Sequence, residues 1–445
     1  MWERLRSIWT VPDLRNKILF TLGMLLIFRI LAHITVPLSQ AEQKALVSLF
    51  NSNQNANLGQ LLGLLDVFSG GSLQTFSIVA LGVYPYITAT IVMQLLQPII
   101  PALQNLSLQG EAGRLRFSQI TRIIAVPLAF LQALGNSAIF QKAGVLQNFN
   151  LLDPRYALES WAIMLSLTAG TMILVWLGEL ITENGIGNGI SLIIFGGIVS
   201  RLPQFVQQGY VATTSSGGGG GGVVSIGVFL LIGLVTILGI VYIYLGQRRV
   251  PVQYPTKRTV GRGMLVGSAQ TTYIPLQVNS AGMIPLIFAQ SMLLFPSVIS
   301  QYLSTSTTPW LRDSATWVST YLANPQQWWY WALFFVLVVA FTYFYAYVMW
   351  QQQNIPENLQ KQGAFIPGYR PGEPTSRYLV NILNRITLAG ALFLGIVAVL
   401  PYVSRIGANQ LLGSASLLIV VGVVLDTVRQ LESQMVMRNY SGFLS

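Results

Sequence analysis

The chain has 445 residues, of which 53% are hydrophobic and 9% are charged, and its formal net charge is +11. An ordinary soluble domain carries about 25% charged residues, so a protein of this composition could not present a water-soluble surface. Many apolar runs reach the length of about 20 residues that crosses a bilayer. The composition therefore predicts a polytopic helical membrane protein rather than a soluble domain with a large core.

Cysteine is absent, and the single histidine, His33, lies in the first apolar run. Disulfides, thiolate metal sites and a cysteine nucleophile are thereby excluded, as is a histidine cluster or triad within the chain. The sequence also carries no nucleotide-binding motif and no HExxH metal motif. We expect a protein that is not an enzyme and that uses no cofactor and no metal.

In chain order, ten apolar runs are candidates to span the membrane as helices. They are residues 18–37, 75–98, 118–140, 160–181, 188–206, 223–245, 281–300, 328–350, 380–402 and 411–429. A shorter apolar run, 58–69, cannot span and predicts a re-entrant or interfacial segment. It ends in Ser69-Gly70-Gly71-Ser72, a sequence that lets the chain turn before the next helix.

The distribution of positive charge predicts the orientation of these spans. With the N-terminus inside, the cytoplasmic segments hold 18 Lys and Arg, whereas the outside segments hold six. Because Lys and Arg gather on the cytoplasmic side of membrane proteins, we expect both termini in the cytoplasm and an even number of spans.

Two long cytoplasmic loops, 247–278 and 351–379, hold much of this charge. Residues 247–263 alone contain five of the 25 Lys and Arg: Arg248, Arg249, Lys257, Arg258 and Arg262. A few charges near a span end act as topology signals alone. A long projecting cationic loop is also typical of a docking surface for an acidic or nucleic-acid partner. The charge pattern leaves both interpretations open.

A flexible, Gly-rich segment, 211–222, separates the first five predicted spans from the last five. The chain is therefore expected to consist of an N-terminal half, 1–210, and a C-terminal half, 223–445. Inverted-repeat membrane proteins use such an arrangement, but the two halves show no obvious sequence similarity.

The middles of the spans are nearly free of ionisable residues. Glu179, Glu183 and Asp426 fall at cytoplasmic helix ends. A secondary transporter of a small solute, which usually keeps such groups at mid-membrane, is therefore the less favoured alternative. A lipid-handling membrane enzyme is opposed by the lack of a catalytic cluster. The GIGNG sequence at 185–189 predicts a bend or tight helix packing.

Apolar and amide side chains at particular depths are the other candidates for function. Val83, Ile87, Ile287 and Ile419 are expected near the middle of their spans, either as ordinary core or lipid-facing residues or as a hydrophobic constriction that blocks ions by dewetting. Gln94 and Asn279, near cytoplasmic span ends, either hydrogen-bond across a helix pair or face headgroups.

Several spaced blocks of sequence resemble one family over nearly the whole chain. They include DVFSGGSLQTFSIVALGVYPYITATIVMQLL (66–96), WLGELITENGIGNGISLIIFGGIVSRLP (176–203), VQYPTKRTVGR (252–262) and AFIPGYRPGEPTSRY (364–378). On these blocks the sequence is similar to the SecY family of protein-conducting channel subunits.

The resemblance implies an all-α fold of ten membrane helices in two pseudo-symmetric five-helix halves, with a plug helix at 58–70. It implies a plug formed by Leu61, Leu62, Leu64, Leu65, Asp66, Val67 and Phe68. It further implies a pore ring of Val83, Ile87, Ile186, Ile190, Ile287 and Ile419, and a lateral gate with Gln94 and Asn279. Val83 stands where the family often has Ile, which keeps the ring apolar.

The resemblance also implies a function and partners. The expected function is translocation of unfolded secretory proteins across the bacterial plasma membrane, and lateral insertion of membrane proteins into it. The expected partners are the SecE and SecG subunits, the motor ATPase SecA, the ribosome through its rRNA, signal sequences, unfolded preproteins and membrane lipid. SecA and the ribosome would dock on Arg248, Arg249, Lys257, Arg258, Arg262, Arg370 and Arg377.

Overall fold

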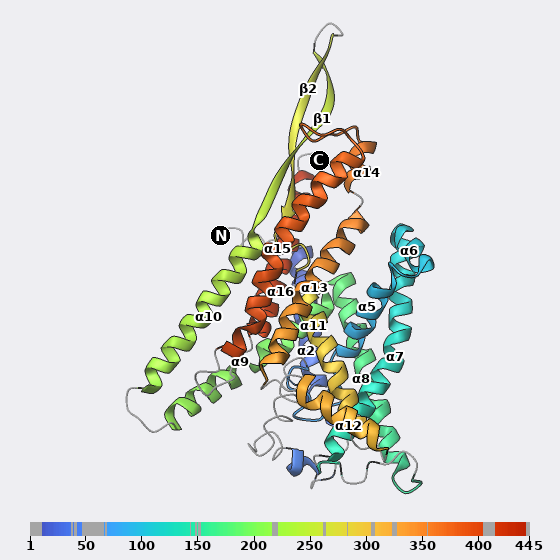
Figure 1. Ribbon diagram of the computed structural model, residues 1–445, viewed down its shortest axis with the longest axis vertical. Coiled ribbons are helices and arrows are strands. Elements are labelled where there is room, and N and C mark those ends of the chain that lie inside the picture. Colours follow the sequence, from blue (N-terminus) through green and yellow to red (C-terminus); the bar gives the residue numbers. More distant parts are fainter. Residues whose placement is uncertain are drawn as a thin grey trace.

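The computed structural model shows a bundle of long helices with a two-stranded ribbon projecting from one end (Figure 1). It describes residues 11–36, 39, 42–46, 66, 69–142, 144–146, 149, 153–215, 221–260, 264–282, 284–303, 308–322, 327–353, 355–403 and 414–441. Within these residues, 4 helices are long and apolar enough to cross a membrane. The fold is thus the mostly helical membrane protein that the composition predicts.

Each predicted span overlaps a helix of the described part of the chain, although these helices differ in length. The helices before the Gly-rich segment are α2 (Pro12–Leu31), α5 (Tyr84–Leu96), α6 (Pro101–Leu108), α7 (Gly110–Lys142), α8 (Ala157–Asn184) and α9 (Gly189–Ser215). After it come α10 (Gly221–Leu245), β1 (Gln247–Val260), β2 (Met264–Gln277), α11 (Ile284–Leu303), α12 (Pro309–Trp317), the π-helical turn η2 (Val318–Leu322), α13 (Trp328–Gln353), α14 (Ile355–Lys361), α15 (Glu373–Val403) and α16 (Ser414–Ser441).

The first two helices differ from the apolar runs from which they were predicted: α2 has the expected 20 residues but begins and ends earlier than 18–37, and α5, with 13 residues, is shorter than 75–98. α2 ends at Leu31, where β-branched residues and the coming Pro37 disfavour further helix. The chain then runs extended: Val36 N–H donates to the Phe76 carbonyl at 3.0 Å, and Ile78 N–H donates to the Ile34 carbonyl at 3.0 Å. Residues 69–83 consequently form turns, and α5 begins only at Tyr84.

A separate apolar cluster holds this irregular stretch in place. Phe76 packs edge-on against Phe140 of α7 with ring centroids 5.1 Å apart, and Leu73 is buried in the same cluster. Irregular backbone at membrane depth is tolerated where protein surrounds it. The stretch that precedes α5 therefore has a fixed shape although it is not helical.

The predicted basic loop 247–278 is a β-hairpin. β1 and β2 pair antiparallel from Gln247 opposite Gln277 to Val260 opposite Met264. The alternation of Val250, Val252 and Tyr254 has the period of two that a half-buried strand requires. The loop predicted between two helices is therefore an extended ribbon, the one substantial β element that the described residues add to the all-α prediction.

Helices also extend into the predicted Gly-rich linker from both sides. α9 continues to Ser215 and α10 begins at Gly221, while residues 216–220 lie outside the described residues. A helix satisfies its own backbone hydrogen bonds, which apolar surroundings demand, so the segment without helix is at most a few residues long.

Candidate functional site

The expected ring residues largely gather in one apolar cluster at the centre of the bundle. Val83 and Ile419 are buried members of this cluster, and Ile87, Ile190 and Ile287 pack against it. They come from the start of α5, from α9, from α11 and from α16, which are far apart in the sequence. The fold thus brings side chains from both halves of the chain into one apolar cluster.

Four of these residues, Val83, Ile87, Ile190 and Ile287, lie at or near the starts of their helices, whereas Ile419 is the sixth residue of α16. Val83 is the N-cap of α5, and Ile87 and Ile287 lie in the first turns of α5 and α11. Ile190 is the second residue of α9. The apolar runs include turn residues as well as helix, and hydropathy alone could not locate the boundary between them.

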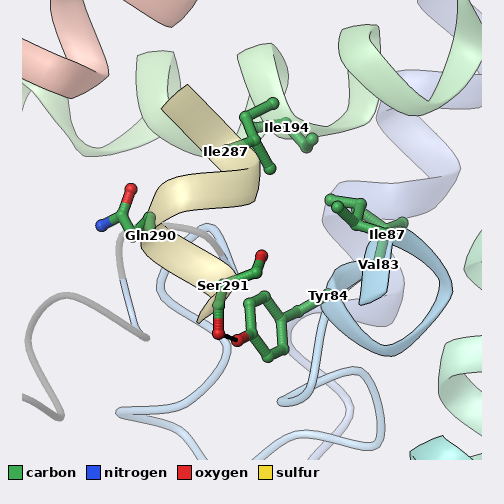
Figure 2. Close-up of a pocket in the computed structure, with 7 residues that line it drawn as sticks. All are labelled: Val83, Tyr84, Ile87, Ile194, Ile287, Gln290 and Ser291. Carbon is green, nitrogen blue, oxygen red and sulfur yellow. Dashed lines mark hydrogen bonds between the residues drawn. The ribbon is translucent and has the colours of Figure 1, made fainter. Parts of the chain in front are cut away.

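A small cavity lies beside several of these residues (Figure 2). Its volume is about 10 Å³, which is roughly the space of one water molecule. Its lining consists of Val83, Tyr84, Ile87, Ile194, Ile287, Gln290 and Ser291. Sequence reasoning did not select Ile194, although its spacing of four residues after Ile190 places it on the same helix face.

Ile186 lies outside this cluster, in the turn between α8 and α9. It is buried, and its backbone N–H donates to Thr21 Oγ1 at 3.2 Å. The GIGNG turn forms the tight packing that the sequence predicted, because a Cβ on Gly189 would lie 1.9 Å from the Gly178 carbonyl oxygen. Asn188 caps α9 by accepting from Ile190 N–H at 3.1 Å.

A seam runs between the two halves where α11 packs against α5 and α7. The Tyr84 hydroxyl of α5 donates to the Ser291 carbonyl of α11 at 3.1 Å, across this seam (Figure 2). The side-chain oxygens of Gln94, Asn279 and Gln290 are buried without a hydrogen-bond partner. Unpaired polar groups are costly to bury, so these three oxygens do not stabilise the packing around them.

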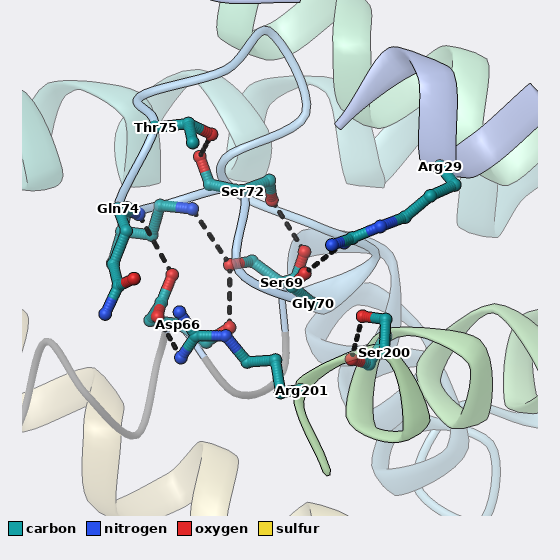
Figure 3. Close-up of polar contacts among 11 residues, drawn as sticks. Arg29, Asp66, Ser69, Gly70, Ser72, Gln74, Thr75, Ser200 and Arg201 are labelled. Carbon is teal, nitrogen blue, oxygen red and sulfur yellow. Dashed lines mark hydrogen bonds and ion pairs between the residues drawn. The ribbon is translucent and has the colours of Figure 1, made fainter. Parts of the chain in front are cut away.

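Most of the expected plug residues, namely Leu61, Leu62, Leu64, Leu65, Val67 and Phe68, lie outside the described residues. Asp66 is described, and it is fully buried. It forms an ion pair with Arg201 of α9, a residue that the charge count had placed on the outside. Figure 3 shows this pair beside Arg29 of α2, whose Nη1 donates to the Gly70 carbonyl at 2.9 Å.

The arginines that were expected to dock a partner, where their side chains are described, lie at the hairpin end of the molecule. Arg248 and Arg249 at the base of β1 are exposed, as is Arg370. Arg377 is exposed and pairs with Glu373 at 2.7 Å. Lys257 and Arg258 lie in β1, opposite Gly267 and Val266, with undescribed side chains, and Arg262 lies outside the described residues.

The two predicted basic loops are joined at the base of the hairpin. Gln253 N–H donates to the Phe365 carbonyl at 2.9 Å, and Phe365 N–H donates back to the Gln253 carbonyl at 3.0 Å. Val252 of β1 and Leu379 of α15, both fully buried, belong to one apolar cluster beneath this contact. An isolated hairpin is only marginally stable, so the second loop and α15 give this one its support.

Comparison with known proteins identifies the family. A family model described as SecY matches residues 77–428. The chain belongs to the SecY family. The protein translocase subunit SecY of Streptomyces coelicolor is 41% identical over 446 residues, covering 97% of this chain and 97% of that relative.

Solved structures share the SecY fold with this chain. One is described as showing that the plug domain of the SecY protein stabilises the closed state of the translocation channel; its TM-score is 0.62 at 18% identity, over 95% of this chain and 92% of that one. Another is Sec61 in the canine ribosome-channel complex from the endoplasmic reticulum, with a TM-score of 0.56 at 18% identity, over 95% of this chain and 93% of that one.

Proposed function

We propose that this chain forms the channel of a bacterial protein translocase, which passes unfolded secretory proteins across the plasma membrane and releases membrane proteins sideways into it. The observation that carries the proposal is the apolar constriction, to which α5, α9, α11 and α16 each contribute aliphatic side chains. Membership of the SecY family supports it.

The constriction suits a passage that must admit any sequence. Aliphatic side chains offer no hydrogen bonds or charges that would hold a passing polypeptide, and a narrow apolar gap excludes ions by dewetting. Val83, Ile87, Ile190, Ile287 and Ile419 form the ring around the chain in transit, with Ile186 at its cytoplasmic side. The plug, 58–70, closes the passage at rest.

The seam between α5, α7 and α11 is the lateral gate. A signal sequence is an apolar helix, which partitions between lipid and the helices of the seam. The buried, unpaired oxygens of Gln94 and Asn279 support this role, because the closed seam leaves them unsatisfied. Separation of the N-terminal half, 1–210, from the C-terminal half, 223–445, opens the gate and the ring together.

The hairpin and the segment 351–379 form one cytoplasmic docking platform for the ribosome or SecA. Exposed arginines suit phosphate groups, which they bind in bidentate fashion. A structural relative is described in complex with a ribosome. In this chain the hairpin projects from the helix bundle (Figure 1) and would contact such a partner. Translation or ATP hydrolysis by the partner supplies the energy, SecE braces the two halves, and SecG lies peripherally.

The test is transport into liposomes that contain this chain with SecE, supplied with SecA, ATP and a signal-bearing preprotein. Protection of the preprotein from added protease, dependent on SecA and on ATP, is the expected result. A lack of protection, with the same SecA active on a known channel, would reject the proposal and favour the alternative of a small-solute transporter.

A further inference from the structure

A buried cluster of charged side chains lies between α2, α9 and the turn that follows the plug. Within it, Asp66 is 0% and Arg201 6% exposed, and the two form an ion pair (Figure 3). Two charges withdrawn from water lose much of their hydration energy, so such a pair is seldom kept for stability alone. Neither residue belongs to the ring, the gate or the docking platform.

The contacts of this cluster hold the backbone of the turn from two helices. The Gln74 N–H donates to Asp66 Oδ1 at 3.0 Å, while Arg201 of α9 pairs with the other carboxylate oxygen. Arg29 of α2 donates to the Gly70 carbonyl at 2.9 Å. Asp66 and Gly70 are thus each held by an arginine, and the two arginines come from different helices.

Close packing accompanies these polar contacts. A Cβ placed on Gly70 would lie 2.7 Å from the Cα atom of Gly197, one turn before Arg201 on α9. The turn therefore lies directly on the backbone of α9. Asp66 is the point at which the plug segment, 58–70, enters this contact.

We propose that Asp66 and Arg201 form a latch that holds Asp66 and the turn 69–74, at the end of the plug, against α9 in the sealed channel, and that opening the channel breaks this pair. The inference rests on the channel function proposed above. When the turn leaves α9, both charges regain water, so an intact pair can separate at modest cost. Removing one partner instead leaves the other charged and buried in the sealed state, which opposes sealing. Arg201 is thus a positioning residue for the plug.

The test compares Arg201→Met, Asp66→Leu and the double variant in the reconstituted channel with SecE. Because removal of one partner of a buried pair shifts an equilibrium by a factor of about 100 or more, each single variant should raise halide leak at least tenfold. Each should also export a preprotein with a defective signal sequence. The double variant, which buries no lone charge, should leak less than either single variant.

Arg122→Met is the matched control. It breaks an ion pair of 3.0 Å with Glu179 that joins α7 and α8 away from the plug. This variant should remain as tight as the native channel. If it leaks as much as Arg201→Met, the effect is general loosening of the bundle and the latch is rejected.

A second measurement reports the latch even if the single variants assemble poorly. The chain has no cysteine, so Ser72→Cys, at a fully buried position, provides a unique thiol. Maleimide should label it several-fold faster when Arg201→Met is also present. Equal labelling rates, or single variants as tight as the native channel while that channel still translocates, would overturn the latch. Failure of the native channel to translocate would count against the proposed function instead.

Discussion

Replacing Gly70 by alanine should open the sealed channel by a calculable amount. Gly70 has φ +69°, and its added Cβ would lie 2.7 Å from the Cα of Gly197, a backbone atom that cannot turn aside. Overpacking of this kind costs about 1–3 kcal/mol, and it acts only while the turn lies on α9. The ratio of sealed to open channel should therefore fall by about 5- to 150-fold.

Gly110→Ala is the control for the strain of the left-handed conformation. Gly110 has the same φ of +69°, but a Cβ there meets nothing within 4 Å. In both variants, a residue with a Cβ must adopt the left-handed conformation, which costs about 1–2 kcal/mol. Only Gly70→Ala adds the close contact between the new Cβ and the Cα atom of Gly197. Iodide efflux from proteoliposomes measures the leak. Equal efflux from Gly70→Ala, Gly110→Ala and the native channel would refute the claim that this contact is part of the seal.

Three further predictions concern the ring, the gate and the hairpin. Ile419→Asn should admit water and raise ion conductance in planar bilayers, whereas Val424→Asn, on an exposed position of the same helix, should not; equal conductance would argue against the ring. Tyr84→Phe removes the hydrogen bond to the Ser291 carbonyl, which is worth about 0.5–1.5 kcal/mol. Export of preproteins with shortened signal sequences should therefore rise a few-fold. Unchanged export of these preproteins would show that this hydrogen bond does not hold the gate closed. Leu379→Ala should destabilise the hairpin base by about 2–5 kcal/mol and speed tryptic cleavage of the ribbon; a native cleavage rate would show that the base cluster does not support it.

Composition and apolar run length were sufficient to predict the helical membrane fold, because a bilayer imposes one dominant constraint on the chain. The hairpin was not predicted, because residues far from it in the sequence stabilise it. Its strands are held by Gln253 and Phe365, 112 residues apart, and by a cluster shared with α15. Such long-range support leaves little trace in local sequence.

The individual site residues show a similar division. Apolar composition suggested a constriction, and the family resemblance supplied Ile186 and Ile190, but hydropathy could not show that Val83 caps a helix instead of lying within one. The pair of Asp66 and Arg201 could not be predicted, since the two residues fall in separate apolar runs, 58–69 and 188–206, and no local pattern links them. Only the fold brings them together within a buried cluster.

The position of three members of the proposed ring at helix starts has an electrostatic consequence. Ile87, Ile190 and Ile287 lie in the first turns of α5, α9 and α11, and each helix N-terminus carries a partial positive charge of about half a unit. The positive ends of these dipoles thus lie beside members of the proposed ring, whose side chains carry no charge. A ring that widens for a passing polypeptide should therefore repel sodium ions and protons more than chloride. During a brief opening, anions would cross the membrane faster than cations, and the sodium and proton gradients would therefore be largely kept.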